Sequence, residues 1–150
     1  MPRRLVALYA LTIFSSSFLL FEVQPLIAKI ILPRFGGAAA VWLVCLLFFQ
    51  AVLLLGYLYA HLLTSHLRSV VQRRIHAAAL LASLFTLPIL PRFSGNPTVA
   101  PELRVLFVLA SAVGLPYFLL ASTTPLLQAW SAQARASSSI YRYYALSNAG

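Results

Sequence analysis

The chain has 150 residues, of which 61% are hydrophobic and 9% are charged, and its mean hydropathy is +0.90. A soluble domain averages about 45–50% apolar and about 25% charged residues, so a chain of this size cannot hide so much apolar surface from water. The net charge of +9 does not indicate nucleic-acid binding, because the arginines separate apolar blocks and form no basic patch interleaved with aromatics.

The apolar blocks predict an all-α, polytopic transmembrane helix bundle with four complete spans and the start of a fifth. A spanning helix needs about 20 mostly apolar residues. The blocks cover residues 5–32, 41–63, 76–90 and 103–127, and a fifth begins at about residue 143. Because the chain stops as this last run begins, we expect residues 1–150 to be the N-terminal transmembrane domain of a longer protein. Its partners would be lipid and the remaining helices of that protein.

The first block has some features of a signal peptide. The basic MPRR start is followed by the apolar run Leu5–Phe14 and then by small serines that would suit cleavage. The apolar run nevertheless continues to Leu32, which favours an uncleaved first span.

Arginine placement predicts the orientation. Seven arginines flank the ends that would lie with the N-terminus, and three flank the opposite ends. Cytoplasmic loops carry an excess of basic residues, so we expect a multi-pass protein of the bacterial inner membrane with a cytoplasmic N-terminus. The seven are Arg3, Arg4, Arg68, Arg73, Arg74, Arg135 and Arg142, and the three are Arg34, Arg92 and Arg104.

Polar side chains interrupt the first block in the stretch LLFEVQPLIAK. Ionisable residues at membrane depth are costly and are candidates for function. Pro25 cannot donate to the carbonyl of Phe21, so we expect it to interrupt the helix. Glu22 and Gln24 would then line a polar, substrate-binding cavity, with Lys29 nearby. The alternative is structural: Lys29 reaches the outer interface, and Glu22 caps the second half-helix.

The second block offers a matching polar face. Gln50 and Tyr57 recur at helical spacing with Leu54 and His61, so Gln50 is predicted to face the cavity. The alternative is a single interhelical hydrogen bond from Gln50. Gly56 and Ala60, four residues apart, suit close packing of helices. In the fourth block, Pro116 and Pro125 predict kinks.

The sequence gives little support for a haem site, a metal site or a catalytic site. A bis-histidine haem site needs two histidines on facing helices at one depth, and His66 and His76 lie near helix ends. Cys45 has no second cysteine and lacks the partners of a metal site. No HExxH, GxSxG, Walker or GxGxxG motif occurs, so no catalytic residue and no cofactor is expected in this chain.

Four stretches carry a resemblance to a known family: FEVQPLIAKIILPRFGGAAAVW, CLLFFQAVLLLGYLYAHLL, GLPYFLLASTTPLLQAW and YRYYALSNAG. They resemble the N-terminal membrane region of bacterial proteins that fuse a major-facilitator-like transporter to a spermidine synthase. The resemblance implies a C-terminal aminopropyltransferase-like domain that uses decarboxylated S-adenosylmethionine and putrescine. The glycine-rich loop and acidic residues of that domain are not in this chain, so its catalytic residues cannot be assigned here.

Two functions follow. The chain is either the membrane region that anchors or couples a spermidine-synthase-like enzyme of polyamine biosynthesis, or a transporter-like module for a small, possibly cationic, substrate. An ordinary transporter of the resembled type has about a dozen helices, whereas four to five are visible here. A glycine-rich strand–loop–helix in the continuation of the gene would favour the first function, and six or more further helices the second.

Overall fold

The computed structural model describes residues 3–35, 39–87, 91, 100–134 and 147–149, and this part of the chain forms helices without a strand. The helices are α1 (Arg3–Ile31), α2 (Ala39–His66), α3 (Ser69–Ser83), α4 (Pro101–Leu109) and α5 (Leu115–Ala134). Short 3-10 segments, η1 (Leu32–Phe35) and η2 (Leu84–Thr86), follow α1 and α3. A π-helical segment, η3 (Ala110–Gly114), joins α4 to α5, so these elements form one rod.

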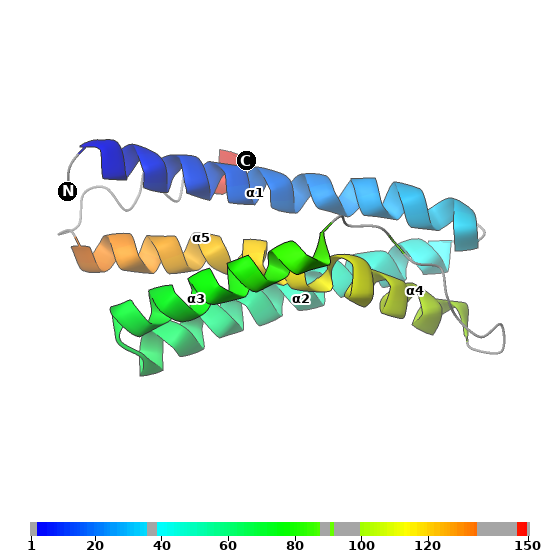
Figure 1. The fold of residues 1–150 in the computed structure, drawn as a ribbon. Helices are drawn as coiled ribbons and strands as arrows, with labels where there is room; N and C mark the ends of the chain where they lie inside the picture. The colour runs from blue at the N-terminus through cyan, green and yellow to red at the C-terminus, as the bar shows by residue number, and fades with distance from the viewer. Residues whose placement is uncertain (1–2, 36–38, 88–90, 92–99, 135–146, 150) are drawn as a thin grey trace.

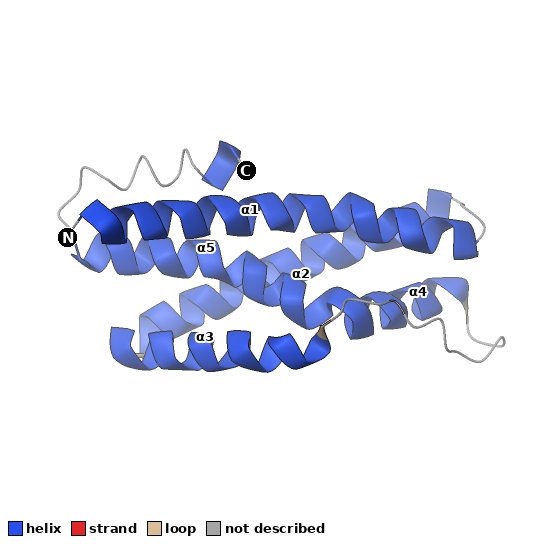
Figure 2. Cartoon of the chain, turned by 45° about the horizontal axis from the view of Figure 1, so that its top comes forward, coloured by secondary structure: helices blue, strands red, loops and turns tan. Residues whose placement is uncertain are grey.

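The rods α1, α2 and α4–α5 lie along one long axis (Figures 1 and 2). α5 packs extensively against both α2 and α1, which contact each other little. α4 packs on α2, and α3 on α5. The start of α1 and the α2–α3 turn lie at one end of the bundle, and the starts of α2 and α4 at the other (Figure 1). This arrangement places α5 at the centre of the bundle.

Among the described residues, three helical segments are long and apolar enough to cross a membrane: Arg4–Phe35, Ala39–His66 and Pro101–Gln133. The third predicted span, residues 76–90, is not among them, because α3 has 15 residues and so measures about 22 Å against a hydrocarbon core of about 30 Å. α3 also begins at Ser69, seven residues before the predicted start. A span at this position, and with it the total of four, stays a prediction, and the predicted start of a fifth helix at about residue 143 lies outside the described residues.

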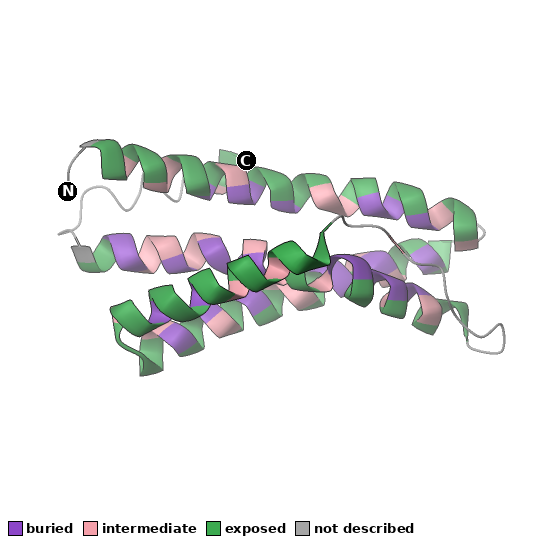
Figure 3. Ribbon diagram, viewed as in Figure 1, coloured by how far each residue is buried: buried purple, intermediate pink, exposed green. Residues whose placement is uncertain are grey.

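Figure 3 shows exposed residues along the outward faces of the helices, and many of the exposed side chains are large and apolar. Leu47, Leu54 and Phe107 are each about two-thirds exposed or more. Such side chains suit contact with lipid tails, as expected for a membrane bundle. The core lies along α5, where Tyr117 and Leu126 are fully buried.

Two prolines have different outcomes. The predicted interruption at Pro25 is wrong, because α1 runs without a break from Arg3 to Ile31 with Pro25 inside it. At Pro116, which offers no N–H to the carbonyl of Ala112, the helix widens to a π turn over Ala110–Gly114, and the kink predicted there stays a prediction.

The small pair Gly56 and Ala60 is buried on α2 as predicted. A Cβ built on Gly56 would lie 2.8 Å from the Cβ of Ala121 on α5. The absence of a side chain at Gly56 therefore lets α2 and α5 approach closely.

Candidate functional site

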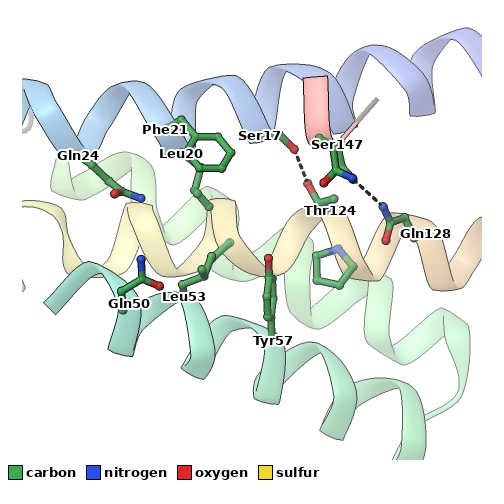
Figure 4. Close-up of a pocket in the computed structure, with 13 residues that line it drawn as sticks. Ser17, Leu20, Phe21, Gln24, Gln50, Leu53, Tyr57, Thr124, Gln128 and Ser147 are labelled. Atoms are coloured by element: carbon green, nitrogen blue, oxygen red, sulfur yellow. Dashed lines mark hydrogen bonds between the residues drawn. The ribbon is translucent and has the colours of Figure 1, made fainter. Parts of the chain in front are cut away.

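A cavity of about 400 Å³, lined by both polar and apolar residues, opens between α1, α2, α5 and residues 147–148 (Figure 4). Its volume falls within the usual range for small-molecule sites, about 300–1,000 Å³. The described lining residues are Ser17, Leu20, Phe21, Gln24, Gln50, Leu53, Tyr57, Ala121, Thr124, Pro125, Gln128, Ser147 and Asn148. None of them is charged, so the described wall offers only neutral hydrogen-bonding groups and apolar surface.

Helical periodicity explains why polar groups meet here. On α1 and α2 a polar residue recurs after seven residues, and on α5 after four, and both spacings return to one face of a helix. The three polar pairs are Ser17 and Gln24 on α1, Gln50 and Tyr57 on α2, and Thr124 and Gln128 on α5.

Part of the polar lining is committed to bonds within the protein. The amide Nε2 of Gln24 donates to the hydroxyl of Tyr117 at 2.6 Å. The hydroxyls of Ser17 and Thr124 lie 3.4 Å apart and link α1 to α5. These bonds hold the cavity walls together.

Other polar groups remain available to a ligand. Gln50 and Tyr57 extend from α2 toward the cavity (Figure 4), and neither has a hydrogen-bond partner among the described residues. Pro125 lacks an N–H, so the carbonyl of Ala121, another lining residue, has no helical donor. A molecule with both donors and acceptors would complement this set.

The predicted site residues separate into two groups. Gln24 and Gln50 line the cavity from opposite helices, as Figure 4 shows. Glu22 and Lys29 are exposed and do not line it. The reason is angular: residues two apart on a continuous helix point about 200° apart, so Glu22 and Gln24 cannot share a cavity. Once α1 is unbroken, the expectation that Glu22 joins Gln24 fails.

Several lining residues are not among the predicted site residues. Ser17, Thr124 and Gln128 were not predicted, although Ser17 precedes Gln24 by seven residues. Leu54 and His61, which shared the predicted face of α2, are exposed and outside the cavity. Polar residues seven apart on α1 and α2 and four apart on α5 would have been the better signal.

A second polar cluster joins α3 to α5. The indole N–H of Trp130 donates to Gln72 Oε1 at 2.6 Å, and His76 Nε2 lies 3.0 Å from Thr123 Oγ1. Ser69 adds a third bond, from its hydroxyl to Gln133 Oε1 at 2.5 Å. α3 lies outside the three candidate spans, and burial lowers the pKa of His76 below its ordinary value of 6.5.

Among the described residues, no group of three or more His, Cys, Asp or Glu side chains is placed to hold a metal ion. His61 and His66 are exposed, whereas His76 is buried. Cys45 is a buried free thiol that lines a smaller cavity of about 130 Å³ together with Gln24 and Trp42.

Comparison with known proteins adds no assignment. The sequence matches no protein-family model, and it matches no curated protein and no solved structure at a significant level. The resemblance to the spermidine-synthase fusion family therefore stays a prediction from the sequence. What the structure supports is a helical protein with three candidate membrane spans and a polar cavity among them.

Proposed function

We propose that this chain is a membrane-embedded module that binds a small, hydrogen-bonding solute in the cavity between α1, α2 and α5. One observation carries the proposal: Gln24, Gln50 and Tyr57 converge from two apolar candidate spans on one cavity. Polar side chains inside a membrane bundle are expected to face protein or a wet cavity. This proposal corresponds to the transporter-like module, the second of the two functions predicted from the sequence.

The wall chemistry favours a neutral solute over a cationic one. A buried cation needs a paired carboxylate or a comparable set of ligands. Glu22, the one acidic residue near this depth, points away from the described cavity. Amides and hydroxyls offer matched donors and acceptors, which suits a solute such as a polyol or an amide.

The membrane setting that we propose is the bacterial inner membrane, with the N-terminus in the cytoplasm. Arg4 in the first turn of α1 and Arg68 in the α2–α3 turn belong to the same end of the bundle (Figure 1). Arg34 and Arg104 belong to the other end, where Arg104 lies 5.5 Å from the ring centroid of Phe35. The excess of arginines at the first end supports a cytoplasmic position for it.

A role as the membrane region of a spermidine-synthase-like protein is the second proposal. Its support is the four sequence stretches that resemble that family. In that case decarboxylated S-adenosylmethionine would bind to the domain beyond this chain. The two proposals are compatible, because a solute-binding membrane region can be joined to an enzyme domain.

Thiol accessibility tests the cavity. With Cys45 replaced by alanine, we compare Gln50→Cys with Leu54→Cys, the matched control one turn away. Both positions are exposed on the isolated bundle, but only Gln50 lines the cavity. In lipid, a charged water-soluble thiol reagent should modify the cysteine at 50 and leave the one at 54 unmodified.

Probe solutes then test the ligand class. Glycerol at high concentration should slow modification at position 50, and putrescine should not. Equal modification at both positions would contradict a wet cavity. Protection by putrescine alone would overturn the preference for a neutral solute.

A further inference from the structure

The hydrogen bonds around His76 determine which of its ring nitrogens carries the proton. Thr123 Oγ1 lies 2.6 Å from the carbonyl of Leu119, and a carbonyl can only accept, so the Thr123 hydroxyl proton is committed there. His76 Nε2 lies 3.0 Å from Thr123 Oγ1 and must therefore donate a hydrogen bond to it. In a neutral imidazole this leaves Nδ1 as a bare acceptor.

The neighbouring groups leave no alternative partner for Nδ1. The indole of Trp130 can only donate, so Gln72 presents Oε1 to it, and Gln72 Nε2 donates to the carbonyl of Leu67 at 2.7 Å. Both ends of the Gln72 amide thus already have a partner. Nδ1 of His76 is buried without a hydrogen-bond partner among the described residues, and so is the hydroxyl of Tyr59 on α2.

These two unpartnered atoms are complementary. The hydroxyl of Tyr59 is a donor with no acceptor, and Nδ1 of His76 is an acceptor with no donor. The two rings face each other with centroids 6.1 Å apart and planes tilted by 39°. Leaving two buried polar groups unsatisfied is costly, and buried waters commonly resolve such pairs.

We propose that one water molecule is bound between Tyr59 and His76. It accepts the Tyr59 O–H and donates to His76 Nδ1, while its second hydrogen and lone pair remain for nearby backbone. This site is separate from the cavity between α1, α2 and α5, and it does not depend on the function proposed for that cavity.

The surroundings keep His76 neutral, as this arrangement requires. Tyr59 faces it from α2, and Thr123 and Trp130 face it from α5. On α3, the exposed Arg73 precedes His76 by three residues, and α2, α3 and α5 contain no Asp or Glu. No carboxylate on the helices packed around it would therefore favour the imidazolium.

The bound water would connect α3 to α2. The buried residues of α3 are Gln72 and His76, and both bond to α5. α3 is thus attached to the bundle through hydrogen bonds more than through buried apolar side chains. A Tyr59–water–His76 bridge supplies the corresponding polar link on the α2 side.

The test uses the whole chain, labelled with 15N-histidine, in detergent micelles. In the unsubstituted protein we expect a protonated Nε2 and a bare Nδ1 at His76, with magnetisation transfer from water to the His76 ring protons. In Tyr59→Phe the Nδ1 signal should shift and the water transfer should be lost. The signals of His61 and His66 serve as internal controls and should not move.

Thermal unfolding gives an independent measurement. Tyr59→Phe should lower Tm in the unsubstituted chain but should not lower it in a His76→Leu background, because leucine has no polar atom that could bind the water.

Three results would overturn the proposal. A protonated Nδ1 in the unsubstituted protein would contradict the assigned tautomer. A rise in Tm on Tyr59→Phe would show that the hydroxyl is unsatisfied. A His76 signal that responds to Tyr59→Phe without any water transfer would indicate a direct hydrogen bond and no bound water.

Discussion

The close contact at Gly56 leads to the sharpest prediction about stability. In Gly56→Ala the new Cβ would lie 2.8 Å from the Cβ of Ala121, 3.2 Å from the carbonyl oxygen of Phe118 and 3.2 Å from the backbone N of Ser122. Comfortable carbon–carbon contacts lie at about 3.5–4.0 Å. Two of the three neighbours are backbone atoms of α5, which cannot rotate away. α2 and α5 must therefore separate to accommodate the methyl group.

The expected change in the free energy of unfolding is the difference between two opposing effects. Overpacking a tight interface costs about 1–3 kcal/mol, and the rigid backbone neighbours place this site near the upper value. Alanine in place of glycine inside a helix returns about 1 kcal/mol. We therefore expect Gly56→Ala to lower the free energy of unfolding by about 2 kcal/mol.

Gly114→Ala is the matched control. A Cβ at Gly114 would meet its nearest neighbour, Phe48, at 3.8 Å, which is an ordinary contact. Its unfolding free energy should stay unchanged or rise slightly. Both variants would be measured by denaturant unfolding in micelles, followed by far-UV circular dichroism.

A double-substitution cycle tests the contact itself. Ala121→Gly removes the neighbour at 2.8 Å, so Gly56→Ala should cost less in that background. If Gly56→Ala is as stable as Gly114→Ala, the close approach of α2 and α5 is not as described. If the cycle shows no coupling, the cost does not arise at Ala121.

Three further predictions concern polar groups and orientation. Gln24→Leu should lower the unfolding free energy by about 1–2 kcal/mol, because it leaves the buried Tyr117 hydroxyl unpaired. Adding Tyr117→Phe to the same chain should recover part of this loss. If it recovers none, the Gln24–Tyr117 hydrogen bond is not the cause of the loss. Because the pKa of His76 is lowered in the folded state, the unfolded chain binds more protons below about pH 6.5, so the free energy of unfolding should fall as the pH is lowered through this range. The fall should be smaller in His76→Gln. An equal fall in both proteins would show that His76 is not its cause. In intact cells, with the native cysteine replaced, an impermeant reagent should label Ala39→Cys but not Ser65→Cys, and the opposite pattern would reverse the proposed orientation.

The apolar blocks determined the helices. In lipid every backbone polar group must be satisfied within the segment, so long apolar stretches have few alternatives to a helix. Three of the four predicted blocks coincide with candidate spans, and Gly56 with Ala60 identified the close-packed face of α2. These features depend on composition and short-range spacing, which the sequence contains directly.

The cavity required the tertiary structure. Whether Pro25 breaks α1 depends on how well the neighbouring helices support it, and the unbroken helix turns Glu22 away from Gln24. The pairing of Gln24 with Tyr117 joins residues 93 apart in the chain. No local pattern predicts such a contact, because it depends on the rotation of α1 relative to α5.

The docking of α3 was likewise decided only by the packed bundle. Its short length and low apolar content make a weak signal in the sequence, and its buried residues are polar. Gln72 and His76 become buried because Trp130 and Thr123 on α5 provide partners for them. Local composition therefore determines where helices form. The burial of polar groups depends instead on hydrogen-bond partners that only the assembled helices bring close together.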